Sequence, residues 1–287
     1  MILSIGEILA DIFFDQNDGK MTAKLGGAPF NMAVSASRSG AKVSFLGRVG
    51  ADPLGKWLIA EAKKYGLDSL NVQEDPLHDT TIAMVTVKDG ERDFQFLRKF
   101  SADYYLDVKK DDVKADIVHV GSLMLSEKRG VKTANAIFDY ARNAGILTSF
   151  DVNYRSDIFP TAKQAVDAYK PFIERANILK FSEEEITLFT GLSPQEGIKT
   201  FKNKLVCVTL GENGSIAYKD GVLVSCPTNK VKPVDTTGAG DAFYGAFVAG
   251  VDKIGYDDLT KDSIYQILKD ANEKGAKATT FVGAIRL

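Results

Sequence analysis

The residues with the clearest chemical potential form a short segment, Asp235–Asp241, which reads DTTGAGD and leads into an apolar stretch. Gly238 and Gly240 leave the backbone open where a helix is expected to begin, over 239–251. The first N–H groups of a helix have no internal partner, and the helix dipole favours negative charge there. The turn is therefore a candidate anion site.

Asp241 lies in the first turn of this expected helix, directly beside the candidate anion site. A carboxylate there would repel a phosphate that is merely bound. It suits a general base that accepts a hydroxyl proton while the N–H groups hold a phosphoryl group in transfer. For such a turn taken alone, a carboxylate that only caps the helix by charge–dipole attraction is an equally good interpretation.

Short apolar runs alternate with helical segments along most of the chain. The expected strands are 1–5, 42–47, 117–120, 146–150, 178–181 and 205–209, with a hairpin over 215–225. The expected helices are 30–39, 54–65, 131–143, 162–172, 182–190, 239–251 and 263–279. This alternation predicts an α/β fold with a mainly parallel sheet that is covered by helices on both faces. Since no linker or repeat interrupts it, we expect a single domain over 1–287.

Segments of about 11–25 and 80–98 break this rhythm and read as hairpins, each turned near an Asp-Gly pair. Side chains alternate between the two faces of a strand, so Phe94, Phe96 and Arg98 are expected to share a face. We expect the two hairpins to form one small sheet that projects from the main domain.

Composition restricts the function from another direction. Among 287 residues, 45% are apolar and 26% are charged, and the formal net charge is -2. This balance lacks the basic excess expected for a nucleic-acid partner. No run approaches the about 18 apolar residues of a membrane helix, and no signal peptide is evident. Cys207 and Cys226 form no CxxC and are expected to be reduced thiols, which predicts a cytoplasmic protein.

Several common site motifs are missing from the sequence. The GxxxxGKS/T loop of Walker-type ATPases does not occur. No GxGxxG follows the first expected strand, which counts against a dinucleotide-dependent dehydrogenase. His78 and His119 have no partners at metal-ligand spacing, so a zinc site is not expected.

Two motifs far apart in the chain resemble the signatures of the ribokinase-like (pfkB) carbohydrate kinases. Residues 235–246, DTTGAGDAFYGA, resemble the second signature position by position. Residues 26–33, GGAPFNMA, resemble the first, with Gly40 and Gly50 at the right spacing. The resemblance implies a ribokinase-like three-layer α/β/α sandwich with a β-sheet lid. It also implies an ATP-dependent sugar kinase, a phosphotransferase with an alcohol acceptor.

The resemblance further implies how ATP is held. Asp241 would be the catalytic base, and the N–H groups of Gly238, Ala239 and Gly240 would form the anion hole for the γ-phosphate. The residues implied to lie near the rest of the nucleotide are Thr209, Gly211, Gly214 and Thr279. Without the resemblance, 205–214 reads as an ordinary glycine turn between strands.

Metal ions are implied at two further positions. Ser182–Glu185 resembles a family Asn-x-x-Glu motif that organises Mg²⁺ through water, with Glu185 retained and Ser182 in place of asparagine. Ser182 and Glu185 also form a capping-box pattern, so the serine has a structural role available. Asp235 resembles a residue that helps bind K⁺ in some members of the family.

The implied sugar site contains Asp11, Gly27 and Asn31. A carboxylate and a carboxamide can both bind hydroxyls, and glycine lets a sugar approach the backbone. Taken without the resemblance, Asp11 reads as a solvated strand residue and Asn31 as a cap at the start of a helix.

Other segments bear on which sugar is bound. GGAPFN, Phe96–Leu97–Arg98 and the 151–155 segment ending in Arg155 resemble the fructokinase subgroup, which makes D-fructose the expected substrate. An arginine guanidinium suits a carboxylate or a phosphate. If Arg98 or Arg155 reaches a substrate carboxylate, 2-keto-3-deoxygluconate becomes the better substrate. Ribose is a further alternative.

A non-catalytic sugar-binding protein on the same fold is an alternative of a different class. Retention of Asp241 and of the Gly-Ala-Gly turn counts against it.

In related kinases the lid sheet often pairs two subunits, and the mixed apolar faces of 81–87 predict a homodimer here.

Overall fold

The main sheet is mostly parallel, as the alternation of strands and helices predicted. The computed structural model describes residues 1–16, 18–88 and 91–287. Its nine-stranded sheet has the order β13-β12-β11-β10-β9-β8-β1-β4-β5. The strands are β1 (Ile2–Ile5), β4 (Val43–Gly50), β5 (Ser69–Asp75), β8 (Ile117–Val120), β9 (Leu147–Asp151), β10 (Ile178–Ser182), β11 (Leu205–Thr209), β12 (Ser215–Lys219) and β13 (Val222–Cys226). Only the pairings of β12 with β11 and β13 are antiparallel within the part of this sheet that is described.

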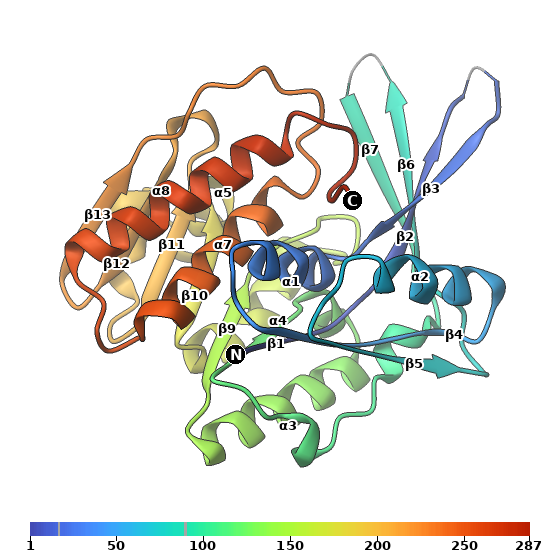
Figure 1. The fold of residues 1–287 in the computed structure, drawn as a ribbon, viewed down its shortest axis with the longest axis horizontal. Helices are drawn as coiled ribbons and strands as arrows, with labels where there is room; N and C mark the ends of the chain where they lie inside the picture. Colours follow the sequence, from blue (N-terminus) through green and yellow to red (C-terminus); the bar gives the residue numbers. More distant parts are fainter. Residues whose placement is uncertain (17, 89–90) are drawn as a thin grey trace.

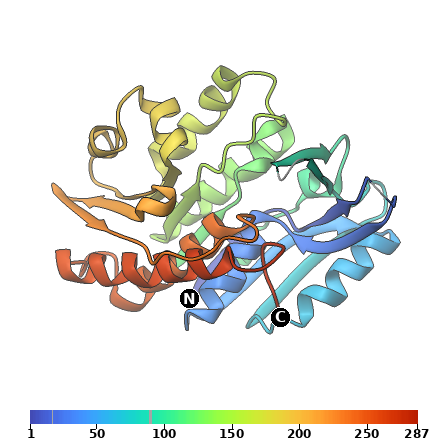
Figure 2. The same ribbon diagram turned by 90° about the horizontal axis from the view of Figure 1, so that it is seen from above.

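Helices cover both faces of the sheet and give the expected three layers (Figures 1 and 2). One face carries α1 (Ala28–Arg38), α2 (Pro53–Lys63), α7 (Ala239–Ile254) and α8 (Lys261–Ala278). The other face carries α3 (Lys128–Ala144), α4 (Ala162–Arg175), α5 (Glu183–Thr190) and the short α6 (Pro194–Gly197). Successive residues of a strand point to opposite faces of the sheet. In β1, Ile2 packs in the core on the first face and Leu3 in the core on the second. None of the described helices combines the length and apolar character that crossing a membrane requires.

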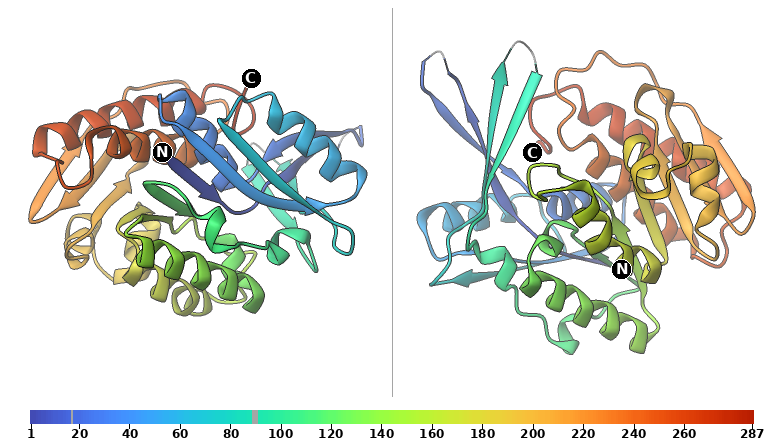
Figure 3. Two further views of the ribbon diagram at one scale, coloured as in Figure 1. Left: turned by 60° about the horizontal axis from the view of Figure 1, so that its bottom comes forward. Right: turned by 180° about the vertical axis from the view of Figure 1, so that it is seen from behind.

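A separate four-stranded sheet, the lid, has the order β3-β2-β6-β7 and projects from the main body (Figures 1 and 3). Its strands are β2 (Leu9–Phe14), β3 (Met21–Gly26), β6 (Ile82–Lys88) and β7 (Glu91–Leu97). The two antiparallel hairpins join through a parallel pairing of β2 with β6. The predicted turn residues Asn17, Asp89 and Gly90 and the side chain of Phe94 lie outside the described residues.

Strand β5 was missed by the sequence analysis. Its sequence, SLNVQED, is mostly polar and only Asp75 is fully buried, as suits a strand at the edge of the main sheet, where one side has no neighbour. Residues 231–234 form a loop, in which the Val234 N–H donates to the Thr279 carbonyl.

Candidate active site

A cavity of about 1420 Å³ opens between the lid, the start of α7 and the carboxyl ends of β10 and β11. Most of the predicted site residues line it, although they come from distant parts of the chain. They are Asp11, Gly27, Asn31, Phe96, Arg155, Ser182, Glu185, Thr209, Gly211, Asp235, Gly238, Gly240 and Asp241. Ligands of open α/β sheets bind at this end of the strands, so the position is chemically reasonable.

The turn before α7 is shaped by its glycines. Gly238 adopts a left-handed conformation with φ of 74°, and a Cβ there would lie 2.5 Å from the Cβ of Ala284. The Ala239 N–H donates to the Thr236 carbonyl at 3.2 Å, so the turn itself uses this amide. Among the described residues, the N–H groups of Gly238 and Gly240 donate to no backbone carbonyl. They are therefore the amides best available for an anion.

Asp235 holds this turn in place. Its buried carboxylate accepts hydrogen bonds from the N–H of Thr237 at 2.8 Å and from the N–H of Gly283 at 2.6 Å. The bonds tie the turn to the C-terminal segment, which also supplies the close contact to Gly238. The start of α7 is thus held on two sides.

Asp241 faces the cavity and has a fixed hydrogen-bond partner. Asn31 Nδ2 donates to Asp241 Oδ2 at 2.8 Å, across the contact between α1 and α7. The surrounding protein removes most hydration from the carboxylate and raises the pKa of Asp241 to about 6, although Asn31 and the positive charge of Lys180 oppose the rise. Asn31 therefore does not cap α1, whose N-cap is Gly27.

The predicted sugar end of the cavity lies where the lid meets α1. Asp11 is only 7% exposed, so the solvated-strand interpretation is wrong. Gly27 has φ of 110°, and a Cβ there would lie 2.5 Å from the Glu7 carbonyl oxygen. No other residue would fit at this junction without strain.

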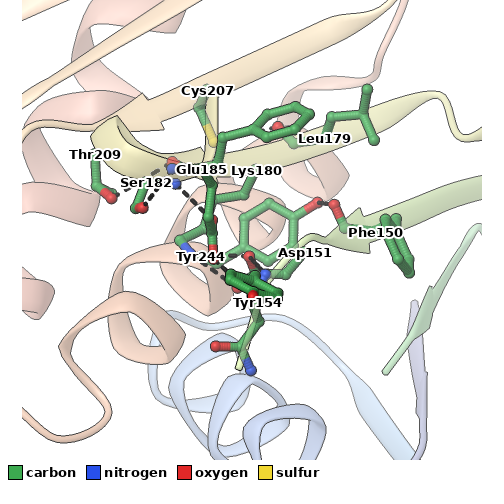
Figure 4. A network of polar contacts seen from close by, with 12 residues as sticks. Phe150, Asp151, Tyr154, Leu179, Lys180, Ser182, Glu185, Cys207, Thr209 and Tyr244 are labelled. Atoms are coloured by element: carbon green, nitrogen blue, oxygen red, sulfur yellow. Dashed lines mark hydrogen bonds and ion pairs between the residues drawn. The ribbon is translucent and has the colours of Figure 1, made fainter. Parts of the chain in front are cut away.

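A buried Lys180–Asp151 ion pair was missed by the sequence analysis (Figure 4). Lys180 Nζ lies 2.9 Å from each Asp151 carboxylate oxygen, and both side chains are buried. Burial disfavours the charged amine, but Asp151 and Glu185 hold the pKa of Lys180 above its ordinary value. A Cβ on Gly240 would lie 3.3 Å from Lys180 Nζ, so the ammonium group stands at the candidate anion site.

The signal for Lys180 was present in the sequence, since a lysine interrupts the otherwise apolar strand ILKFS. Fully buried lysines are rare unless they are paired. The partner could not be read, because Asp151 lies on the neighbouring strand β9.

The predicted capping box at the start of α5 is confirmed. The Ser182 N–H donates to Glu185 Oε2 at 2.7 Å, and the Glu185 N–H donates to Ser182 Oγ at 3.2 Å. The Tyr154 N–H donates to the other oxygen, Oε1, at 2.7 Å (Figure 4). Burial raises the pKa of Glu185, with Lys180 opposing. Among the described residues, no three His, Cys, Asp or Glu side chains gather into a direct cage for a metal ion.

Four predicted site residues do not line the cavity: Arg98, Ala239, Gly214 and Thr279. Arg98 is buried, and its guanidinium group pairs with Asp103 and with the Leu123 carbonyl inside the protein. Gly214 serves a tight turn, since a Cβ there would lie 2.2 Å from the Cys226 carbonyl oxygen. Thr279 ends α8. Of the two arginines predicted to reach substrate, Arg155 is the one that lines the cavity.

Comparisons with known proteins agree with this geometry. Residues 1–286 match the pfkB family of carbohydrate kinases. A probable fructokinase-5 from Arabidopsis thaliana is 36% identical, over 99% of this chain and 93% of its own length.

Solved structures give the same picture. A sugar kinase from Pyrococcus horikoshii in complex with ATP has a TM-score of 0.84 at 31% identity, covering 99% of this chain and 94% of its own. A double mutant of fructokinase from Vibrio cholerae O395, in a form with fructose, ADP and potassium bound, has a TM-score of 0.87 at 31% identity, covering 99% and 93%. The predicted ribokinase-like fold is confirmed. The chain belongs to the pfkB family of carbohydrate kinases and is a sugar kinase, a phosphotransferase with a hydroxyl acceptor.

Proposed function

We propose that this kinase transfers the γ-phosphoryl group of ATP to the primary hydroxyl of D-fructose. The observation that carries the proposal is the position of Asp241, at the tip of α7 and hydrogen-bonded to Asn31, in one cavity with Asp11 and Gly27. The fructokinase relatives over 99% of the chain support fructose as the sugar, as does the Vibrio cholerae relative with fructose and ADP bound.

In this proposal, Asp241 accepts the proton of the attacking hydroxyl. A pKa of about 6 leaves the carboxylate mostly ionised at neutral pH, yet more basic than an exposed aspartate. The sugar oxygen bonds to the γ-phosphorus while the bond to the bridging oxygen breaks, and ADP leaves with that electron pair. The free N–H groups at Gly238 and Gly240 and the ammonium group of Lys180 would stabilise the negative charge.

Mg²⁺ is proposed as the metal ion, with Glu185 as the residue that holds it through water. Mg²⁺ in kinases keeps several waters and binds through one or two carboxylates and the phosphates, which fits Glu185 on the cavity wall and the lack of a protein cage in the described chain. When bound, the ion neutralises phosphate charge.

K⁺ is proposed near Asp235, in line with the potassium of the Vibrio cholerae relative. Because Asp235 shapes the turn before α7, K⁺ would act on the geometry of the anion site. Replacing K⁺ by Na⁺ in the assay should lower kcat, and an unchanged kcat would contradict this role.

A second substrate is favoured by one observation. Arg155 is exposed on the cavity wall, where its guanidinium could bind the carboxylate of 2-keto-3-deoxygluconate. Ribose lacks such a specific argument here.

Release of ADP with fructose, glucose, ribose and 2-keto-3-deoxygluconate as acceptors tests the proposal. We expect the highest kcat/KM with fructose, and Arg155→Met should leave this value within about threefold. A highest kcat/KM with 2-keto-3-deoxygluconate that Arg155→Met abolishes would replace fructose by the sugar acid. Turnover with none of these sugars would contradict the substrate class.

We also propose a homodimer formed through the lid, and a cytoplasmic location. Apolar side chains at Met21 and Leu97 are exposed on the lid, at 64% and 49%. Cys207 and Cys226 are buried free thiols, as expected in a reducing compartment. A monomeric mass by light scattering at assay concentration would contradict the dimer, and cell fractionation tests the location.

A further inference from the structure

A group of buried polar atoms beneath the sugar end of the cavity has no hydrogen-bond partner among the described residues. The atoms are both carboxyl oxygens of Glu7 and Arg98 Nε. Most buried polar groups in proteins are paired, so unpaired atoms that gather in one place call for a physical explanation.

Glu7 and Arg98 approach the same short segment, 121–123. The position that a Cβ of Gly121 would occupy lies 2.9 Å from Glu7 Oε2, and Arg98 Nη1 donates to the Leu123 carbonyl at 3.0 Å. Each charge acts on the other electrostatically, although they form no ion pair in this structure. Arg98 Nη2 donates to the Asp103 carboxylate, so Nε is the guanidinium nitrogen without a partner.

The two residues also mark the roots of the lid. Glu7 lies two residues before β2, which carries Asp11, and Arg98 follows directly after β7, which carries Phe96. The Glu7 backbone in addition touches Gly27 of the sugar site. A bond between Glu7 and Arg98 would therefore connect the two lid strands that contribute side chains to the cavity.

A carboxyl group without a partner at 1% exposure is costly to keep in a fold. Burial raises the pKa of Glu7 to about 8, so the group is largely protonated in this state, and a hydrogen bond from Arg98 would favour its ionised form. Such a group is best explained if it gains a partner in another state of the protein. Arg98 Nε offers the missing donor, and a charge-assisted bond of this kind is strong.

We propose that Glu7 is a positioning residue, which accepts the Nε–H of Arg98 when the lid closes over the sugar and so locks the roots of β2 and β7 together. The proposal deepens the sugar-kinase function and rests on it. Glu7 touches neither reacting atom. It acts through Arg98 on the placement of Asp11 and Phe96.

The test is a double-mutant cycle with Glu7→Leu, Arg98→Lys and the double variant. It is run with whichever sugar of the panel the wild type uses best, so a wrong guess of fructose does not affect it. Arg98→Lys keeps a cation beside Asp103 but removes the Nε donor. We expect each single variant to raise the KM for sugar about tenfold, with kcat and the KM for ATP within about twofold.

Because both single variants break the same bond, the double variant should also lose about tenfold. A combined loss of about 100-fold, or an unchanged KM for sugar in Glu7→Leu, would overturn the proposal. Glu7→Gln keeps the shape and one acceptor oxygen, so its KM should stay within about threefold of the wild type. A KM as high as that of Glu7→Leu would contradict the accepting role.

The control is the Asp139–Arg175 ion pair between α3 and α4, at 2.7 Å and away from the cavity lining. Asp139→Asn and Arg175→Met should lower the melting temperature without changing the KM for sugar. If these variants raise that KM as much as Glu7→Leu does, the effect is general destabilisation and the proposal fails.

Discussion

At the expected phosphate end of the cavity the buried Lys180 and Glu185 meet hydrogen-bond partners, whereas beneath the expected sugar end the carboxyl group of Glu7 does not. Lys180 pairs with Asp151, and Glu185 accepts two backbone N–H groups. Below the lid, Glu7 and Arg98 Nε remain unpaired. In our proposal, the phosphate end is organised before any ligand binds, while the sugar end gains a further bond when the lid closes. Catalysis of phosphoryl transfer depends mainly on positioning and charge, which makes a preformed phosphate end useful.

The largest expected effect comes from removing the proposed base, Asp241. Asp241→Asn should lower kcat by at least about 100-fold, because general-base assistance contributes about 10²–10⁴-fold. The KM for ATP should change little. Asp252→Asn is the matched control. Asp252 lies near the end of the same helix, where it pairs with the amino group of Met1, and its replacement should keep kcat within about twofold. Equal losses in the two variants would exclude a special role for Asp241.

Lys180→Met tests whether the pairing at the phosphate end stabilises the fold. The change leaves the buried Asp151 carboxylate without its cation, so the free energy of unfolding should fall by about 3–5 kcal/mol. Urea unfolding measures the loss. Lys163→Met breaks an exposed pair with Asp167 and should cost at most about 1 kcal/mol. Similar losses for the two lysines would show that burial of the pair does not matter.

The pH dependence of kcat/KM sharpens the assignment of Asp241. The base works in its ionised form, and its pKa is raised to about 6, so activity should fall as the pH drops through about 6. Below that point we expect about tenfold less activity per pH unit. Asn31→Ala removes a hydrogen bond that favours the carboxylate, so the inflection should move upward. An inflection near the ordinary aspartate pKa would contradict the burial effect.

Ser182→Ala has the smallest expected effect. The serine caps α5, and loss of such a cap costs about 1 kcal/mol of stability. Ser182→Asn keeps a capping side chain and should be nearly neutral. A KM for ATP that rises about tenfold in Ser182→Ala, with no rise in Ser182→Asn, would show that the residue binds nucleotide directly as well.

Much of the fold was predictable because buried parallel strands and their helices leave a strong pattern in the sequence. Val118, Leu179 and Val206 each sit in an apolar run that the structure places in the core of the sheet. The edge strand β5 was not predicted, because its mostly polar sequence carries no such pattern.

The grouping of residues at the expected phosphate end was predictable for a local reason. Gly238, Gly240 and Asp241 lie within one turn, and Ser182 and Glu185 within another, so short-range spacing was sufficient. The Lys180–Asp151 pair and the bond from Arg98 to the Leu123 carbonyl depend on which distant segments become neighbours. Sequence spacing carries no information about those contacts, and Arg98 was accordingly predicted at the cavity wall.

The central claim is most directly tested by a crystal structure with fructose and a non-hydrolysable ATP analogue. The account predicts that the terminal phosphorus lies at the N–H groups of Gly238 and Gly240, and that the primary hydroxyl of fructose is within hydrogen-bond distance of the Asp241 carboxylate. A terminal phosphate bound away from the start of α7, with another acid–base group beside the acceptor hydroxyl, would contradict it.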